Sequence, residues 1–178
     1  VRKGTEKFIK ELSKDCEICI FTASTKYYAD IVIDGFDYHH LVDYRLYRQH
    51  TTTSNGINIK DLSKLGRSLE KIIIVDNIEE NYQLQPNNGI NISDFEGDEN
   101  DNELDFLLED LLEIVSKSGK NVIDELPKVR RNMQKRYTNL SWNFLFNENY
   151  IIFSLIFSLK LKILIKRNNN ILLMGIGD

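Results

Sequence analysis

Lys60, Asp76 and Asn77 are polar residues whose types and spacing could handle a phosphate group. Asp76 and Asn77 directly follow the unbroken apolar run IIIV at residues 72–75. Four β-branched residues in a row predict a strand buried on both faces, as in parallel sheets. Polar residues at the carboxyl end of such a strand lie where open α/β sheets bind ligands. Carboxylate and amide oxygens suit Mg²⁺, and a lysine neutralises phosphate as a point charge, so the pattern indicates a magnesium-dependent phosphate site.

A second strand-to-helix turn carries hydroxyl side chains. The apolar segment 16–21 predicts a strand that ends on Thr22-Ala23-Ser24, and residues 25–33 predict the helix that follows. Hydroxyls and backbone N–H groups at the start of a helix bind phosphate well. Helix capping would explain Thr22 and Ser24 equally well, so the residues alone leave both interpretations open.

The elements that must position these residues alternate between helix and strand. Apolar periodicity predicts helices over 4–14, 25–33, 104–115 and 122–136, a short helix at 61–65, and strands at 16–21, 44–47, 72–76 and 90–92. Asn55-Gly56 predicts the turn of a hairpin over residues 51–59. Pro127 falls inside the last helix and is expected either to kink it or to start it afresh. This alternation is typical of an α/β fold with a parallel sheet.

Composition narrows the class of protein. The 178 residues carry 42% apolar and 28% charged side chains, which is ordinary for a globular domain. A net charge of −4 argues against direct binding of nucleic acid. Cys16 and Cys19 lie three apart on a predicted strand and so face opposite sides, which argues against a redox or zinc pair. His39 and His40 lack a third ligand at suitable spacing, which argues against a metal site there. The absence of a predicted disulfide fits a reducing, intracellular compartment.

The character of the chain changes at residue 137. The segment 137–178 is rich in Ile, Leu, Phe, Asn and Lys, and its apolar run at 151–159 is shorter than the ~20 residues that span a bilayer. We therefore expect no transmembrane span. An interfacial segment touching a membrane and a packed terminal element are alternatives, but the composition favours an extension outside the core fold.

Three motifs together resemble one family. They are Phe21-Thr22-Ala23-Ser24, the segment RLYRQHTTTSNGINIKDLSKLGR at 45–67, and IIIVDN at 72–77, with LQPNNGI at 84–90 as a further match. In this order and spacing the chain resembles the small C-terminal-domain phosphatases, or NLI-interacting-factor-like phosphatases, of the haloacid dehalogenase superfamily. The resemblance covers residues 1–130, so we expect a phosphatase-like domain over 1–136 and place 137–178 outside it.

The resemblance implies a Rossmann-like fold and a two-step reaction. Proteins of this family hydrolyse phosphoserine or phosphothreonine in proteins, notably in the tail of RNA polymerase II, with an aspartate nucleophile and Mg²⁺. The partner implied is therefore a phosphorylated protein. Six residues of this sequence match family positions: Thr22 and Lys60 as catalytic residues, Arg48 and Ser24 as substrate-binding residues, and Asn77 with Asp76 at the metal.

One family motif is missing. The family carries an Asp-x-Asp motif on a first strand upstream of the opening helix, and no Asp-x-Asp occurs in this sequence. We therefore expect a parallel sheet that lacks its first strand and has an apolar gap, and a chain that is inactive alone. The alternative is a non-catalytic phosphatase-like binding module, as in the mitochondrial inner-membrane translocase. Retention of Thr22, Lys60, Asp76 and Asn77 favours the enzyme, in the nucleus or cytoplasm rather than the mitochondrion.

Overall fold

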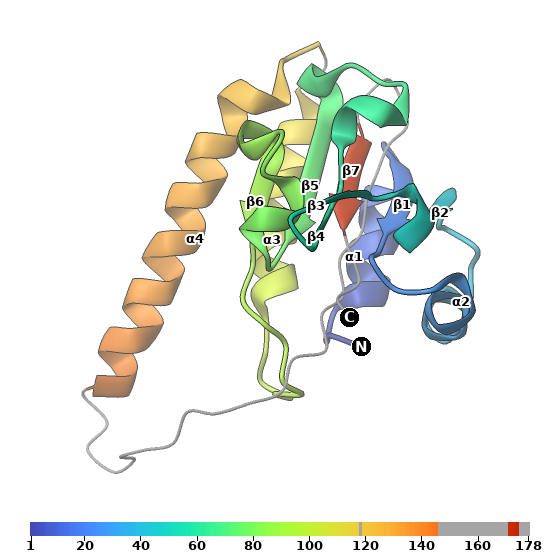
Figure 1. Ribbon diagram of the computed structural model, residues 1–178. Coiled ribbons are helices and arrows are strands. Elements are labelled where there is room, and N and C mark those ends of the chain that lie inside the picture. Colours follow the sequence, from blue (N-terminus) through green and yellow to red (C-terminus); the bar gives the residue numbers. More distant parts are fainter. Residues whose placement is uncertain (118, 146–170, 175–178) are drawn as a thin grey trace.

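A computed structural model describes residues 1–117, 119–145 and 171–174 of the chain (Figure 1). Its helices are α1 (Thr5–Leu12), α2 (Lys26–Asp34), α3 (Glu103–Ser116) and α4 (Val122–Leu145). Its strands are β1 (Glu17–Phe21), β2 (Tyr44–Leu46), β3 (Thr52–Ser54), β4 (Ile57–Ile59), β5 (Ile72–Asp76), β6 (Gly89–Asn91) and β7 (Ile171–Met174). The described residues thus form the mixed helix and strand structure that the sequence predicts.

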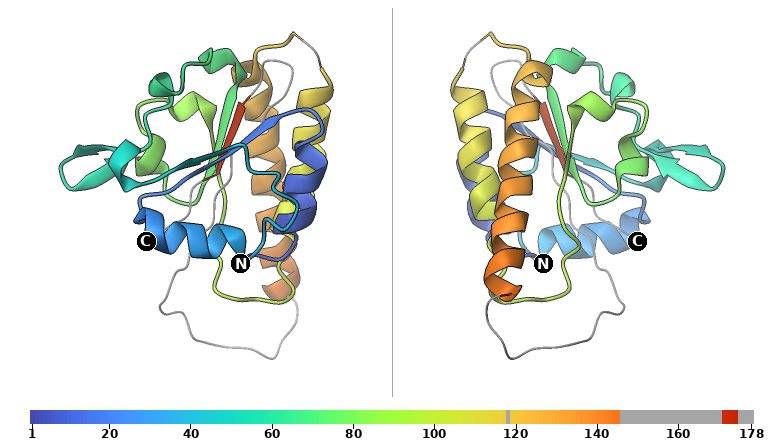
Figure 2. Two further views of the ribbon diagram at one scale, coloured as in Figure 1. Left: turned by 90° about the vertical axis from the view of Figure 1, so that its right-hand side faces the viewer. Right: turned by 90° about the vertical axis from the view of Figure 1, so that its left-hand side faces the viewer.

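The main sheet is parallel throughout and has the strand order β2-β1-β7-β5-β6. Residues alternate between its two faces, as strand geometry requires. Ile18 and Ile20 of β1 belong to a large core to which all four helices contribute. Cys19 and Phe21 belong to a smaller core on the other face. Figure 2 shows α1, α3 and α4 gathered on one side of the sheet, with the β3–β4 hairpin projecting on the other.

The two cysteines confirm this alternation. Cys16 lies in the large core and Cys19 in the small one, and both side chains are buried. Burial raises the pKa of the Cys19 thiol. They are packed side chains on opposite faces of the sheet, as the sequence predicts.

The turn residues predicted from the sequence adopt the backbone conformations that their turns require. Asn55 and Gly56 adopt positive φ values of 51° and 78° between β3 and β4, as a hairpin turn of this type demands. Gly66 ends the 3₁₀ helix η2 (Leu62–Leu65) with φ 67°. Pro127 lies inside a single continuous helix, α4. In the part of the chain that the structure describes, no helix has the length and apolarity to cross a bilayer.

The middle of the sheet differs from our expectation of a gap. β7 lies between β1 and β5 and pairs in parallel with both, Ile171–Met174 running beside Glu17–Ile20 and Ile72–Val75 (Figure 1). The physical reason is that two buried strands cannot leave their facing N–H and C=O groups unpaired. An apolar segment far along the chain supplies these partners.

The predicted boundary at residue 136 therefore does not coincide with a structural break. α4 passes through it and ends at Leu145, and residues 171–174 lie within the sheet rather than outside the fold. The apolar run at 151–159, with its predicted contact to a membrane surface, lies outside the described residues. The assignment of the rest of 137–178 to an extension stays a prediction.

Candidate functional site

Lys60 and Asp76 form a buried ion pair at the carboxyl end of β5. Lys60 Nζ donates to Asp76 Oδ2 at 3.0 Å, and both side chains are fully buried. Asp76 Oδ1 accepts the backbone N–H of Ile78 at 2.7 Å. An ammonium group has three N–H donors, and Asp76 is the single acceptor of Lys60 Nζ among the described residues. Two donors therefore remain to bind an anion.

Asn81, which the sequence analysis did not single out, ties this pair together. Its Nδ2 lies 3.3 and 3.4 Å from the two oxygens of Asp76, and its carbonyl accepts the backbone N–H of Lys60 at 2.6 Å. It belongs to the short 3₁₀ helix η4 (Glu79–Tyr82). No pattern in the polar segment after Asn77 distinguishes this asparagine from its neighbours, so only the fold reveals its position.

Thr22, Ser24 and Arg48 meet at the carboxyl end of β1. Thr22 Oγ1 accepts the N–H of Ser24 at 2.9 Å, and Arg48 Nε donates to the carbonyl of Ala23 at 2.5 Å. The N–H of Arg48 also donates to the Ser24 carbonyl at 3.0 Å. The helix after this turn starts from Thr25, whose side chain makes no capping bond. The Thr22 hydroxyl therefore shapes the turn, and Arg48 lies directly against it.

These two groups of residues face the same edge of the sheet. β1 and β5 flank β7, whose last residue pairs with Ile20 on one side and Val75 on the other. Neighbouring strands lie 4.7–4.9 Å apart, so the ends of β1 and β5 are separated by about 10 Å. The fold thus brings the Thr22 turn and the Lys60–Asp76 pair to opposite sides of the end of the middle strand.

Asn77 offers the oxygen best suited to a cation. Its Nδ2 donates to Asp94, whereas its Oδ1 is buried and has no hydrogen-bond partner. A buried, unpartnered carbonyl oxygen is costly unless a ligand completes it, and Mg²⁺ prefers oxygen ligands of this kind. Both oxygens of Asp76, in contrast, already accept protein donors. Among the described residues, no group of three or more His, Cys, Asp or Glu side chains is arranged so that it could hold a metal ion by itself.

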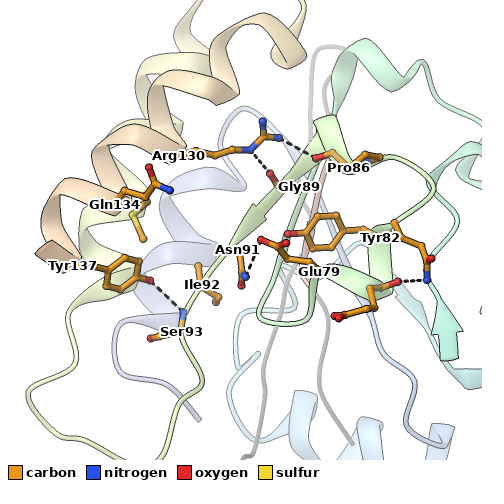
Figure 3. Close-up of a pocket in the computed structure, with 13 residues that line it drawn as sticks. Glu79, Tyr82, Pro86, Gly89, Asn91, Ile92, Ser93, Arg130, Gln134 and Tyr137 are labelled. Atoms are coloured by element: carbon orange, nitrogen blue, oxygen red, sulfur yellow. Dashed lines mark hydrogen bonds between the residues drawn. The ribbon is translucent and has the colours of Figure 1, made fainter.

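A large cavity lies elsewhere in the described part of the chain, between α4, β6 and η4. It has a volume of about 790 Å³, and Arg130, Tyr137, Tyr82, Glu79 and Asn91 are among its lining residues (Figure 3). The Arg130 guanidinium donates to three backbone carbonyls, those of Gly89, Pro86 and Asn87. None of the six predicted site residues lines this cavity, so the candidate site is the sheet edge and not the cavity.

The family of the chain follows from comparison with known proteins. The model of the NLI interacting factor-like phosphatases matches residues 1–125. The chain belongs to this family. The match covers Thr22, Arg48, Lys60 and Asn77, all of which the structure places at the carboxyl edge of the sheet.

Relatives of the chain differ in what their names describe. A probable C-terminal domain small phosphatase of Dictyostelium discoideum is 39% identical over 127 residues, 70% of this chain and 41% of that protein. The mitochondrial import inner membrane translocase subunit TIM50 of Candida glabrata is 37% identical over 101 residues, 56% of this chain and 21% of that protein. The human subunit of this name is 36% identical over 100 residues, 56% and 28%. The chain spans less than half the length of each.

Proposed function

We propose that the chain is part of a magnesium-dependent phosphoserine or phosphothreonine protein phosphatase with the haloacid dehalogenase fold. The carrying observation is the fully buried Lys60–Asp76 pair across the end of β7 from the turn that holds Thr22 and Arg48. Burying a charged pair costs desolvation free energy, which a purely structural strand end would avoid. A site that must neutralise phosphate gives a reason for this cost.

Different residues of the site would bind the phosphate and the magnesium ion. Lys60 donates its remaining N–H groups to phosphate oxygens while Asp76 and Asn81 hold it in place. Arg48 and the Thr22 turn bind the phosphate from the other side. Asn77 Oδ1 would hold Mg²⁺, which when bound offsets negative charge on a transferring phosphoryl group.

The nucleophile is the missing part. The family reaction needs two aspartates separated by one residue, and this sequence contains no such pair. We therefore propose that this chain alone binds phosphate and magnesium but does not turn over substrate. A phosphorylated protein, such as the tail of RNA polymerase II, is the proposed partner of the complete site.

A binding module is the second candidate. One observation favours it: the similarity to TIM50 subunits. Because these relatives are mitochondrial by name, our preference for the nucleus or cytoplasm over the mitochondrion has no support. A binding module would not require Lys60 to be paired and buried, which is why we place the enzyme first.

A chimera tests the proposal. A segment carrying the Asp-x-Asp strand that the family reaction requires would be fused before Val1. We expect Mg²⁺-dependent release of phosphate from a phosphoserine heptad peptide, no release by the unfused chain, and loss of release in Lys60→Met. Lys64→Met, an exposed lysine four residues later, is the control. A folded chimera without activity would favour the binding module.

A further inference from the structure

The contact between Asn77 and Asp94 decides which way the Asn77 carboxamide points. A carboxylate only accepts hydrogen bonds, whereas a carboxamide has one donor end and one acceptor end. Asn77 must therefore turn its Nδ2 toward Asp94, as observed. Its Oδ1 then faces the opposite way, where it is buried without a partner. If residue 94 had a neutral side chain with both a hydrogen-bond donor and an acceptor, the Asn77 carboxamide could bond to it in either orientation.

We infer that Asp94 is a positioning residue that holds the Asn77 oxygen toward the cation site, an inference that rests on the proposed magnesium-dependent function. Asp94 comes from the segment after β6, 17 residues from Asn77. It acts by selecting one of two amide orientations, and only the selected one offers an oxygen to Mg²⁺. Such outer partners of a metal ligand set its orientation and its affinity.

Ser93, the residue before Asp94, is held by hydrogen bonds to several parts of the fold. These bonds keep Asp94 in place beside Asn77. The N–H of Ser93 donates to Glu103 Oε1 at 3.0 Å and to the Tyr137 hydroxyl of α4 at 3.2 Å (Figure 3). The Ser93 carbonyl accepts Arg2 Nη1 at 2.9 Å, and the buried Arg2 side chain also pairs with Glu103 at 2.6 Å. The backbone just before Asp94 is thus tied to both α4 and the start of the chain.

Calorimetric titration of the full chain with MgCl₂, without substrate, tests the inference. Asp94→Asn removes the charge that selects the amide orientation, and we expect the affinity for Mg²⁺ to fall about 10–100-fold. Glu96→Gln removes one charge from an exposed position on the same segment, and we expect a change of less than about twofold, because exposed charges are screened. The exchanged pair Asn77→Asp with Asp94→Asn should recover most of the affinity, since a carboxylate presents oxygen in either orientation.

The outcomes separate this inference from the proposed function. If wild type binds Mg²⁺ and Asp94→Asn binds equally well, Asp94 does not position Asn77, while the proposed function stands. If the loss occurs but the exchanged pair recovers nothing, selection of the amide orientation is refuted as its cause. If wild type binds no Mg²⁺, the metal part of the proposed function fails and this inference fails with it. Circular dichroism of each variant confirms that it is folded.

Discussion

Replacing Lys60 by methionine tests whether the buried pair has the strength that the structure indicates. The substitution keeps an unbranched side chain of similar length but leaves the Asp76 carboxylate buried without its cation. Removing one partner of a buried ion pair costs about 3–5 kcal/mol. Asp76 keeps the N–H donors of Ile78 and Asn81, so we expect a loss near the lower end, about 3 kcal/mol of the free energy of unfolding.

Urea unfolding followed by circular dichroism, together with calorimetry, measures this loss. For chains of 150–250 residues, 1 kcal/mol corresponds to about 2–4 °C in Tm, so we expect Tm to fall by roughly 6–12 °C. The double variant Lys60→Met with Asp76→Asn should be more stable than the sum of the single losses predicts, by about 2 kcal/mol, because it leaves no unpaired charge.

Lys64→Met is the matched control for Lys60→Met. Its side chain is 60% exposed and lies 3.8 Å from Asp61, so its replacement should change stability by less than about 0.5 kcal/mol. If Lys60→Met costs no more than Lys64→Met, or if the effects at Lys60 and Asp76 simply add, the buried pair does not stabilise the site as argued.

Two further predictions concern a close contact and an exposed ion pair. A Cβ at Gly89 would lie 1.9 Å from Tyr82 Cε2, so Gly89→Ala should destabilise the protein by about 1–3 kcal/mol, and additional truncation of Tyr82 should recover part of the loss. Gly35→Ala, where a Cβ would lie 3.3 Å from a carbonyl, should cost clearly less in the same unfolding assay. The hydrogen bond from Lys128 lowers the pKa of Glu113 to about 2 from an ordinary 4.5. Stability from Glu113 is therefore present above pH 4.5 and lost as the pH falls toward 2, so the Tm difference between wild type and Glu113→Gln should vanish over that range; a constant difference would contradict this cause.

Much of the local structure was predictable from sequence. The run at residues 72–75 is the buried strand β5, and Asn55-Gly56 is the hairpin turn, because each depends on side chains within a few positions. The spacing of the family motifs also placed Lys60 and Asp76 at one site, where they form an ion pair. The roles of these residues in binding phosphate and Mg²⁺ stay predictions.

The tertiary structure decided what depends on long-range partners. Asn81 and Asp94 are ordinary polar residues in sequence, and only the chain path brings one to Asp76 and the other to Asn77. The strand that fills the sheet comes from residues 171–174, in a segment whose composition favoured an extension. Local preferences encode where strands and turns form, whereas the backbone groups between two buried strands need hydrogen-bond partners that a segment far along the chain supplies. The sequence by itself therefore determined the elements and the candidate residues, and the fold decided which residues orient them.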